Sequence, residues 1–318
     1  MERVFELIDN YDIITLFRHQ AADSDALGSQ FAFKQWINEC YPKKQVYALG
    51  TSIGSKGCLF PAIDTVDDET VGQSLAIILD TANASRIDDD RWQLAKYKVK
   101  IDHHIFVERY GDLEIIEDRK GATCEILAAA LEQRGETLSK TCAEYLYSGL
   151  IADTLQFSIN ATTPEMLRTA AYLVAQGVDV AKVNEANFSK SFAEFQFENY
   201  IREHFQWKSN CLAYCKITKA EYEQFHLTFN EAKEKVYALG KVNEFCGWAL
   251  FVETERTASG ELLYNGSLRS RNIAIHDIAA QFHGGGHRYA CGVKNLNEET
   301  VDELLETLAN RLACKTSQ

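Results

Sequence analysis

Three short apolar runs without in–out alternation constrain the fold of this chain more than any other feature. They are IITLF at 13–17, LAIIL at 75–79 and VKI at 99–101. A strand with one face in solvent alternates apolar and polar residues, whereas a strand covered on both faces reads as a continuous apolar run. The three runs therefore predict buried parallel strands.

Amphipathic helical patterns follow these runs at 26–40 and 122–135. The second pattern ends at Gly135, a residue type that favours the left-handed conformation in which many helices stop. From 139 to about 177 the pattern is helical throughout. Strand–helix alternation of this kind predicts an α/β fold with a doubly wound, mostly parallel sheet.

The length of 318 residues exceeds what one small core organises, so about two domains are expected. We predict a catalytic domain over 1–184, a helical connector over 185–207, and a smaller α/β domain over 208–318, with a cleft between the two domains. The smaller domain has strand-like segments at 211–218 and 248–255 and a final helix at about 298–313.

Charge and composition exclude several classes of protein. The net charge of −13 argues against a protein that coats long duplex nucleic acid. No apolar stretch approaches the roughly 20 residues that span a bilayer, and MERVFELIDN lacks the layout of a signal peptide. Nine cysteines without a C-x-x-C pair fit reduced thiols. We therefore expect a cytoplasmic protein that does not bind membranes.

Side chains that bind metals or protons follow each predicted strand and one predicted helix. They are His19, Asp23, Asp25, Asp80, Asp102, His103, His104 and Asp153. Because ligands bind beyond the carboxyl ends of the strands in an open parallel sheet, we expect these side chains to lie together. Taken singly, each has a plainer interpretation, such as an N-cap at Asp23 or Asp25 for the helix at 26.

Carboxylates packed this closely repel one another unless a cation or a proton lies among them. Oxygen and imidazole donors without a nearby thiolate suit manganese or magnesium better than structural zinc. The donors are too many for one ion, so the sequence predicts two ions that share a bridging carboxylate. Such pairs serve the hydrolysis of phosphate esters.

Four segments resemble the ordered motifs of the DHH phosphoesterases: HQAADSD (19–25), ILDTAN (78–83), KIDHH (100–104) and GLIADT (149–154). Near the carboxyl end, SLRSR (267–271) and FHGGGHRYACG (282–292) resemble the associated DHHA1 domain. The resemblance covers nearly the whole chain. It departs from the family pattern after DHH, where the family commonly has an asparagine and IFVERYG has none.

The resemblance implies two divalent cations, with manganese the usual ion and magnesium the alternative. Carried over, the ligands form two sets that share a bridging Asp80: His19 and Asp23 on one ion, and Asp25, His103 and Asp153 on the other. His104 is implied to face the scissile phosphate, and Asp102 to orient the histidines.

In the second domain, three consecutive glycines allow backbone amides to approach an anion closely. The resemblance and the nearby cationic side chains favour a clamp for phosphate and base, with Arg269 and His287 foremost. The complete predicted set is Arg269, Arg271, Gly284, Gly285, Gly286, His287 and Arg288. A mobile glycine loop, and arginines that pair with surface acids, are the alternatives.

Within the family, the chain is most similar to bacterial nano-RNases, which degrade short single-stranded oligonucleotides and dephosphorylate 3′-phosphoadenosine 5′-phosphate. This resemblance implies a manganese-dependent hydrolase for such substrates. A cyclic-di-AMP phosphodiesterase, a manganese inorganic pyrophosphatase and a non-catalytic nucleotide-binding regulator are the alternatives. Substrate preference and a homodimeric state stay open.

Overall fold

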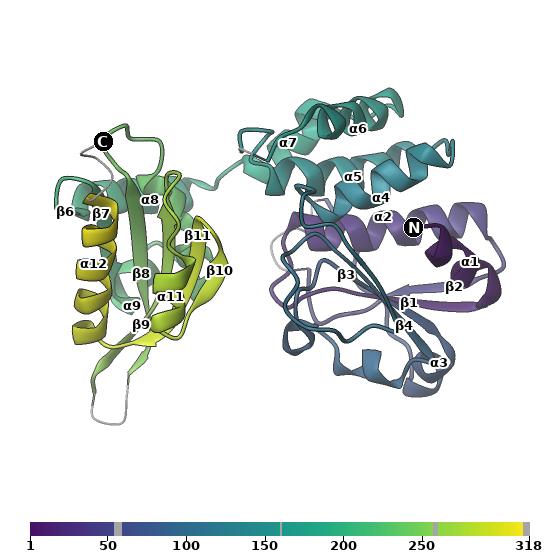
Figure 1. The fold of residues 1–318 in the computed structure, drawn as a ribbon, viewed down its shortest axis with the longest axis horizontal. Coiled ribbons are helices and arrows are strands. Elements are labelled where there is room, and N and C mark those ends of the chain that lie inside the picture. Colours follow the sequence, from purple (N-terminus) through teal and green to yellow (C-terminus); the bar gives the residue numbers. More distant parts are fainter. Residues whose placement is uncertain (54–58, 160, 257–259, 314–318) are drawn as a thin grey trace. The chain divides into compact units, whose positions relative to one another are not determined.

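The chain divides into two compact units, Met1–Ser189 and Lys190–Gln318, each drawn in Figure 1. The computed structural model describes residues 1–53, 59–159, 161–256 and 260–313. Among these described residues, no helix is long and apolar enough to cross a membrane.

The first unit is built on a five-stranded sheet in the order β2-β1-β3-β4-β5, with every neighbouring pair parallel. The strands are β1 (Ile13–Phe17), β2 (Gln45–Ala48), β3 (Leu75–Leu79), β4 (Tyr97–Asp102) and β5 (Leu113–Ile116). The three strands predicted from apolar runs are confirmed, and they form the centre of the sheet. The strand order reverses between β1 and β3, which is where ligands bind in folds of this topology.

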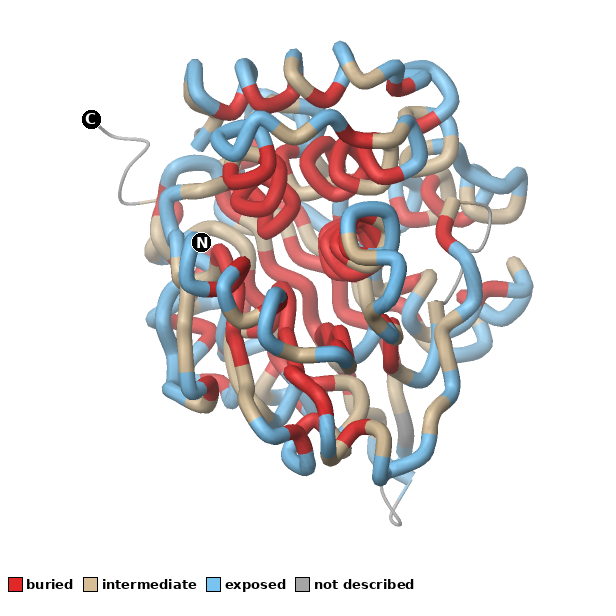
Figure 2. The backbone as a smooth tube through the Cα atoms, turned by 90° about the vertical axis from the view of Figure 1, so that its right-hand side faces the viewer, coloured by how far each residue is buried: buried red, intermediate tan, exposed pale blue. Residues whose placement is uncertain are grey.

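Burial on both faces explains why the central strands do not alternate. Leu75, Ile77 and Leu79 pack into one core cluster, and Ala76 and Ile78 pack into another cluster on the opposite face. Figure 2 shows these central strands as buried. The prediction of a doubly wound α/β fold is therefore confirmed.

Helices cover both faces of the parallel sheet (Figure 1). One face carries α1 (Glu2–Asn10), α2 (Ser24–Cys40), α4 (Thr123–Gln133) and α5 (Lys140–Asp153), followed outward by α6 (Pro164–Ala175) and α7 (Val180–Phe188). The other face carries α3 (Asp68–Gln73).

Both predicted helices of the first unit are present, with shifted starts. α2 begins two residues earlier than predicted, because the Asp23 carboxylate accepts hydrogen bonds from the backbone N–H groups of Asp25 and Ala26. The predicted stop of α4 is confirmed: Gly135 has φ +74°, and its N–H donates to the Glu132 carbonyl.

The second unit contains a six-stranded sheet in the order β10-β11-β9-β8-β7-β6, in which only β7 and β8 pair in parallel. Its strands are β6 (Gln206–Lys208), β7 (Leu212–Ile217), β8 (Gly247–Arg256), β9 (Leu262–Ser270), β10 (Gly285–His287) and β11 (Ala290–Leu296). The predicted strand-like segments correspond to β7 and β8.

Two core clusters lie on the two faces of this second sheet. One contains α8 (Phe192–His204), α9 (Lys219–Glu223), α10 (Phe229–Glu234) and the 3₁₀ segment Lys235–Leu239. The other contains α11 (His276–Gln281) and α12 (Glu298–Ala313), the predicted final helix.

Candidate metal centre

Strand and helix ends of the first unit bring the predicted metal ligands together. Three come from the region after β1, one follows β3, one follows β4 and one ends α5: His19, Asp23, Asp25, Asp80, His103 and Asp153. The strand ends involved flank the point where strand order reverses.

Asp80 lies at the centre of this arrangement. Its Oδ2 lies 3.4 Å from His19 Nε2, while its Oδ1 lies 3.4 Å from His103 Nε2. Its backbone has φ +52°, a left-handed conformation that non-glycine residues adopt rarely and that turns the chain directly after β3. Thr123 Oγ1 donates to Asp80 Oδ1 at 3.2 Å. The two oxygens of one carboxylate thus face two different imidazoles.

The surrounding donors form two groups around these imidazoles. In the first group, His19 Nε2 lies 3.7 Å from Asp23 Oδ2. In the second, His103 Nε2 lies 3.3 Å from Asp153 Oδ2 and 3.8 Å from Asp25 Oδ2. Within each group, one ligand atom per residue lies within 4.8 Å of the others, a spacing that a single cation can satisfy.

Contacts with backbone carbonyls determine which ring nitrogen of His19 and of His103 faces the carboxylates. His19 Nδ1 lies 2.8 Å from the Gln20 carbonyl, and His103 Nδ1 lies 3.3 Å from the Lys120 carbonyl. An Nδ1–H that donates to a carbonyl leaves the lone pair of a neutral ring on Nε2, which is the arrangement of a metal ligand.

An unsatisfied polar atom tests whether a metal fits. Among the described residues, His103 Nε2 is buried and has no hydrogen-bond partner. A buried polar atom in that state is costly, and a divalent cation among the carboxylates of Asp25, Asp80 and Asp153 would satisfy it. The donor set, imidazole and carboxylate without a coordinating thiolate, suits manganese or magnesium.

Asp25 shows how tertiary structure builds the site. Its carboxylate is fully buried and accepts hydrogen bonds from Thr123 N at 2.7 Å and Cys124 N at 2.9 Å, the first amides of α4. Helix amino termini stabilise carboxylates in this way. A Cβ at Gly149 would lie 2.8 Å from Asp25 Cα, so this glycine permits α5 to approach closely.

The electrostatics of the group favour added positive charge. Burial, together with the charges of Asp23 and Asp80, raises the pKa of Asp153 to about 6. Burial and the same kind of repulsion raise the pKa of Asp25 well above its usual range. Burial opposes protonation of His19 and His103, but the aspartates close to each ring outweigh it and raise both pKa values. Without a metal, protons hold the cluster together.

His104 and Asp102 form a separate pair beside Asp80. Asp102 Oδ1 lies 2.7 Å from His104 Nδ1, and His104 Nδ1 lies 3.5 Å from Asp80 Oδ1. Burial would raise the pKa of Asp102, but the hydrogen bond to His104 lowers it overall. Asp102 therefore orients His104, whereas the Lys120 carbonyl contacts the ring of His103.

Sequence reasoning missed two residues that support these groups. Thr123 donates a hydrogen bond to Asp80. The sequence does not indicate this contact, because Thr123 lies 43 positions away at the start of a helix. Lys100 is fully buried, with Nζ 3.6 Å from Asp102 Oδ2 and 2.7 Å from the Ala82 carbonyl. A lysine inside the apolar strand was the available signal for the second.

Comparison with known proteins agrees with this geometry. Residues 13–150 match the N-terminal domain of the DHH family, and residues 227–313 match the DHHA1 domain. The chain belongs to the DHH family.

Relatives in the family extend over nearly the whole chain. An uncharacterised protein of Mycoplasma genitalium is 36% identical over 89% of this chain and 86% of its own length. The bifunctional oligoribonuclease and PAP phosphatase NrnA of Bacillus subtilis is 30% identical over 95% of both chains. An exopolyphosphatase-related protein of Bacteroides fragilis shares the fold, with a TM-score of 0.85 at 21% identity, over 98% of this chain and 96% of its own.

In the DHHA1 unit, sheet register places the two foremost clamp residues on one face. His287 in β10 lies opposite Ala290, which in turn lies opposite Arg269 in β9. Directly opposed residues in a sheet point to the same face. Arg269 Nε donates to Tyr237 Oη at 3.2 Å, and its guanidinium lies 5.0 Å from the centre of that ring.

The three consecutive glycines of the predicted clamp meet different structural constraints. A Cβ at Gly284 would lie 2.2 Å from the Gly292 carbonyl oxygen, and Gly286 has φ +135°. Gly285 faces open space. Because Gly285 and Gly286 pair with β11, they belong to an edge strand rather than a loop. The remaining predicted residues, Arg271 and Arg288, are exposed.

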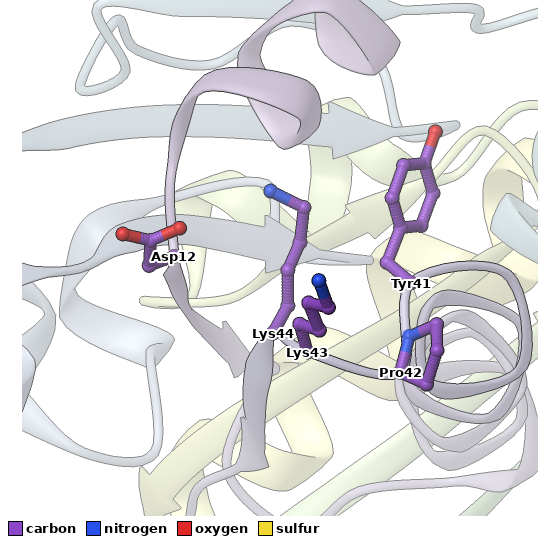
Figure 3. Close-up of a pocket in the computed structure, with 5 residues that line it drawn as sticks. All are labelled: Asp12, Tyr41, Pro42, Lys43 and Lys44. Atoms are coloured by element: carbon purple, nitrogen blue, oxygen red, sulfur yellow. The ribbon is translucent and has the colours of Figure 1, made fainter.

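A pocket elsewhere in the DHH domain is separate from the candidate metal centre (Figure 3). It is lined by Asp12, Tyr41, Pro42, Lys43 and Lys44, at the amino ends of β1 and β2. Its Lys44 Nζ already donates to the carbonyls of Asp9 and Tyr11. The predicted metal ligands lie at the opposite, carboxyl ends of the strands.

Proposed function

We propose that this chain is a two-cation phosphoesterase that hydrolyses short oligoribonucleotides to mononucleotides and dephosphorylates 3′-phosphoadenosine 5′-phosphate. The observation that carries the proposal is Asp80, whose two carboxylate oxygens face the imidazoles of two separate donor groups. The name of the Bacillus subtilis relative, an oligoribonuclease and PAP phosphatase, supports the substrate class.

In this proposal, His19 and Asp23 hold one cation and Asp80 bridges to the other. Asp25, His103 and Asp153 complete the second set. Manganese is the proposed ion, because imidazole and carboxylate donors suit it and magnesium takes fewer protein ligands. Bound cations of this kind supply an activated water and neutralise charge on the phosphate.

The residues around the cations have roles that follow from their contacts. Asp102 accepts the His104 Nδ1–H, which holds the ring beside Asp80 and leaves the other nitrogen to exchange a proton with the substrate. Asp102 is thus a positioning residue. Arg269 and His287, on one face of the DHHA1 sheet, are proposed to bind a phosphate of the substrate, since a guanidinium matches the geometry of phosphate oxygens.

The test is a comparison of substrates with purified protein and manganese. We expect turnover of a dinucleotide and of 3′-phosphoadenosine 5′-phosphate, and none without a divalent cation. Faster turnover of inorganic pyrophosphate, or of cyclic diadenylate, would replace the proposed substrate class. Tight nucleotide binding without any product would indicate a regulator instead. The same preparation, studied by sedimentation, decides whether the protein is a homodimer, and cell fractionation tests the predicted cytoplasmic location.

A further inference from the structure

A run of exposed apolar side chains lies immediately after His104. Ile105, Phe106 and Val107 are 60%, 56% and 62% exposed. Among the described residues, no other consecutive residues with large apolar side chains are exposed in this way. Exposed apolar surface of this kind forgoes favourable burial and marks a site of interaction when it is contiguous.

Anchors on both sides hold this apolar loop in place. Before it, Asp102 binds both the backbone N–H and the ring of His104. After it, Glu108 Oε1 accepts from Ala84 N at 2.5 Å, and Tyr110 Oη donates to the Thr81 carbonyl at 2.5 Å. Tyr110 is packed between Trp92, with ring centres 5.6 Å apart, and Lys100 Nζ, 4.5 Å from the ring centre. The three side chains are therefore presented from a fixed base.

The position of the loop restricts its occupant. Phe106 is two residues from His104, so their Cα atoms are separated by at most about 7 Å. If the phosphate of a ligand lies at the proposed cations, the group attached to that phosphate can therefore contact Phe106. In a nucleotide, that group carries a base with apolar faces.

Two cationic side chains near the loop match an anionic ligand such as a nucleotide. Arg109 extends the loop, and Arg86 Nη2 lies 3.5 Å from His19 Nδ1. Among the described residues, no carboxylate oxygen lies within 4.0 Å of either guanidinium, whereas Arg18 and Arg91 each have an aspartate partner. Apolar and cationic side chains side by side match a base joined to a phosphate.

We propose that Ile105–Val107 is a nucleobase-binding surface, with Phe106 stacking on the base of the nucleotide whose phosphate lies at the metal centre. This inference rests on the proposed function and adds a subsite to it. Bases stack on aromatic rings with little dependence on their identity, so the surface serves oligonucleotides of mixed sequence.

The test compares two ligands that differ only in the base. Dissociation constants for adenosine 5′-monophosphate and ribose 5-phosphate are measured by calorimetry with manganese, on wild type and on Phe106→Ala. We expect the variant to lose about 5- to 150-fold in affinity for the nucleotide and nothing for the sugar phosphate. Phe106→Tyr should retain wild-type affinity. Phe192→Ala, at a 72% exposed phenylalanine of α8, is the matched control and should change neither constant.

Three results would overturn the inference: equal affinity of wild type and Phe106→Ala for the nucleotide, an equal loss for both ligands, or dissociation of a wild-type dimer by the substitution. The last would show that a second copy covers the loop. Turnover of a dinucleotide by wild type is measured separately. Its absence would contradict the proposed function, while the contrast between the two ligands still decides whether the loop binds a base.

Discussion

The candidate metal centre of the DHH domain and the predicted clamp of the DHHA1 domain differ in how firmly the fold fixes them. Asp25 and Asp80 are 0% and 1% exposed, and hydrogen bonds from α4 hold both carboxylates. His287 and Arg288 are exposed on or beside an edge strand. The DHH domain thus presents a preformed set of candidate ligand atoms, whereas the DHHA1 domain presents exposed side chains.

This difference separates two kinds of function. Cations require several donors at short, fixed distances. Burial and backbone hydrogen bonds fix the candidate ligands at such distances. A clamp that accepts more than one nucleotide gains from side chains with several conformations. Substitutions in the first region should therefore remove activity, and those in the second should weaken substrate binding.

The largest effect is expected from Asp80→Asn. Loss of the charge that faces both imidazoles should lower kcat by more than the roughly 100-fold that a lost supporting contact costs. It should also remove the rise in melting temperature caused by manganese. The exposed Asp90→Asn, in the same domain, is the matched control. Turnover near the wild-type rate in Asp80→Asn would show that the carboxylate does not bridge two cations.

Asp102→Asn should have a smaller effect of a different kind. Because Asp102 binds His104, we expect kcat to fall about 10- to 100-fold while the manganese concentration for half-activation stays near the wild-type value. An equal loss of manganese affinity would mean that Asp102 supports the cations instead. Kinetics over a series of manganese concentrations distinguish the two results.

Arg269→Ala should raise KM for a dinucleotide about 10-fold with little change in kcat, as expected for a hydrogen bond to a charged group that binds substrate and transition state alike. Arg271→Ala is the informative partner, because its guanidinium donates to the Val242 and Asn243 carbonyls. We expect a smaller rise in KM there. A large drop in kcat for Arg269→Ala would place this arginine in the reaction itself and would break the contrast between the two domains.

The sequence was sufficient for the central strands and for bringing the candidate metal ligands to one edge of the sheet. Both depend on local patterns: continuous apolar runs predict buried strands, and the polar residues that follow them must lie at one edge of a parallel sheet. β5 was not predicted, because all four of its residues are half-buried and LEII is too short to separate from a loop.

Contacts between distant segments were beyond sequence reasoning. The amides that hold Asp25 lie 98 and 99 positions away in α4, and nothing in the local sequence marks them. The edge strand β10 was not predicted either. A glycine run is typical of a loop, and only the pairing with β11 shows that this one forms a strand. Local sequence identified the candidate ligand side chains, and tertiary packing determined which atoms hold them.

The smallest expected effect concerns stability without metal. At pH 5 an unfolded aspartate has already lost its proton, whereas Asp153, whose pKa burial raises to about 6, still holds one in the folded state. His19 and His103 have raised pKa values when folded, so they too keep protons above the pH at which unfolded histidine releases them. The folded state therefore binds more protons than the unfolded state between about pH 5 and 8.

Stability of the metal-free protein should consequently fall by a few degrees of melting temperature as the pH rises through this range. Manganese should act in the opposite sense, because its ligands must be deprotonated, so the rise in melting temperature that it causes should grow with pH. Thermal melts at pH 5.5 and pH 8, with chelator and with manganese, measure both trends. Arg269→Ala should leave them unchanged, since the DHHA1 side chains are not part of the proton-sharing cluster. A metal-free melting temperature that increases with pH would mean that bound protons do not stabilise the carboxylate cluster of the DHH domain.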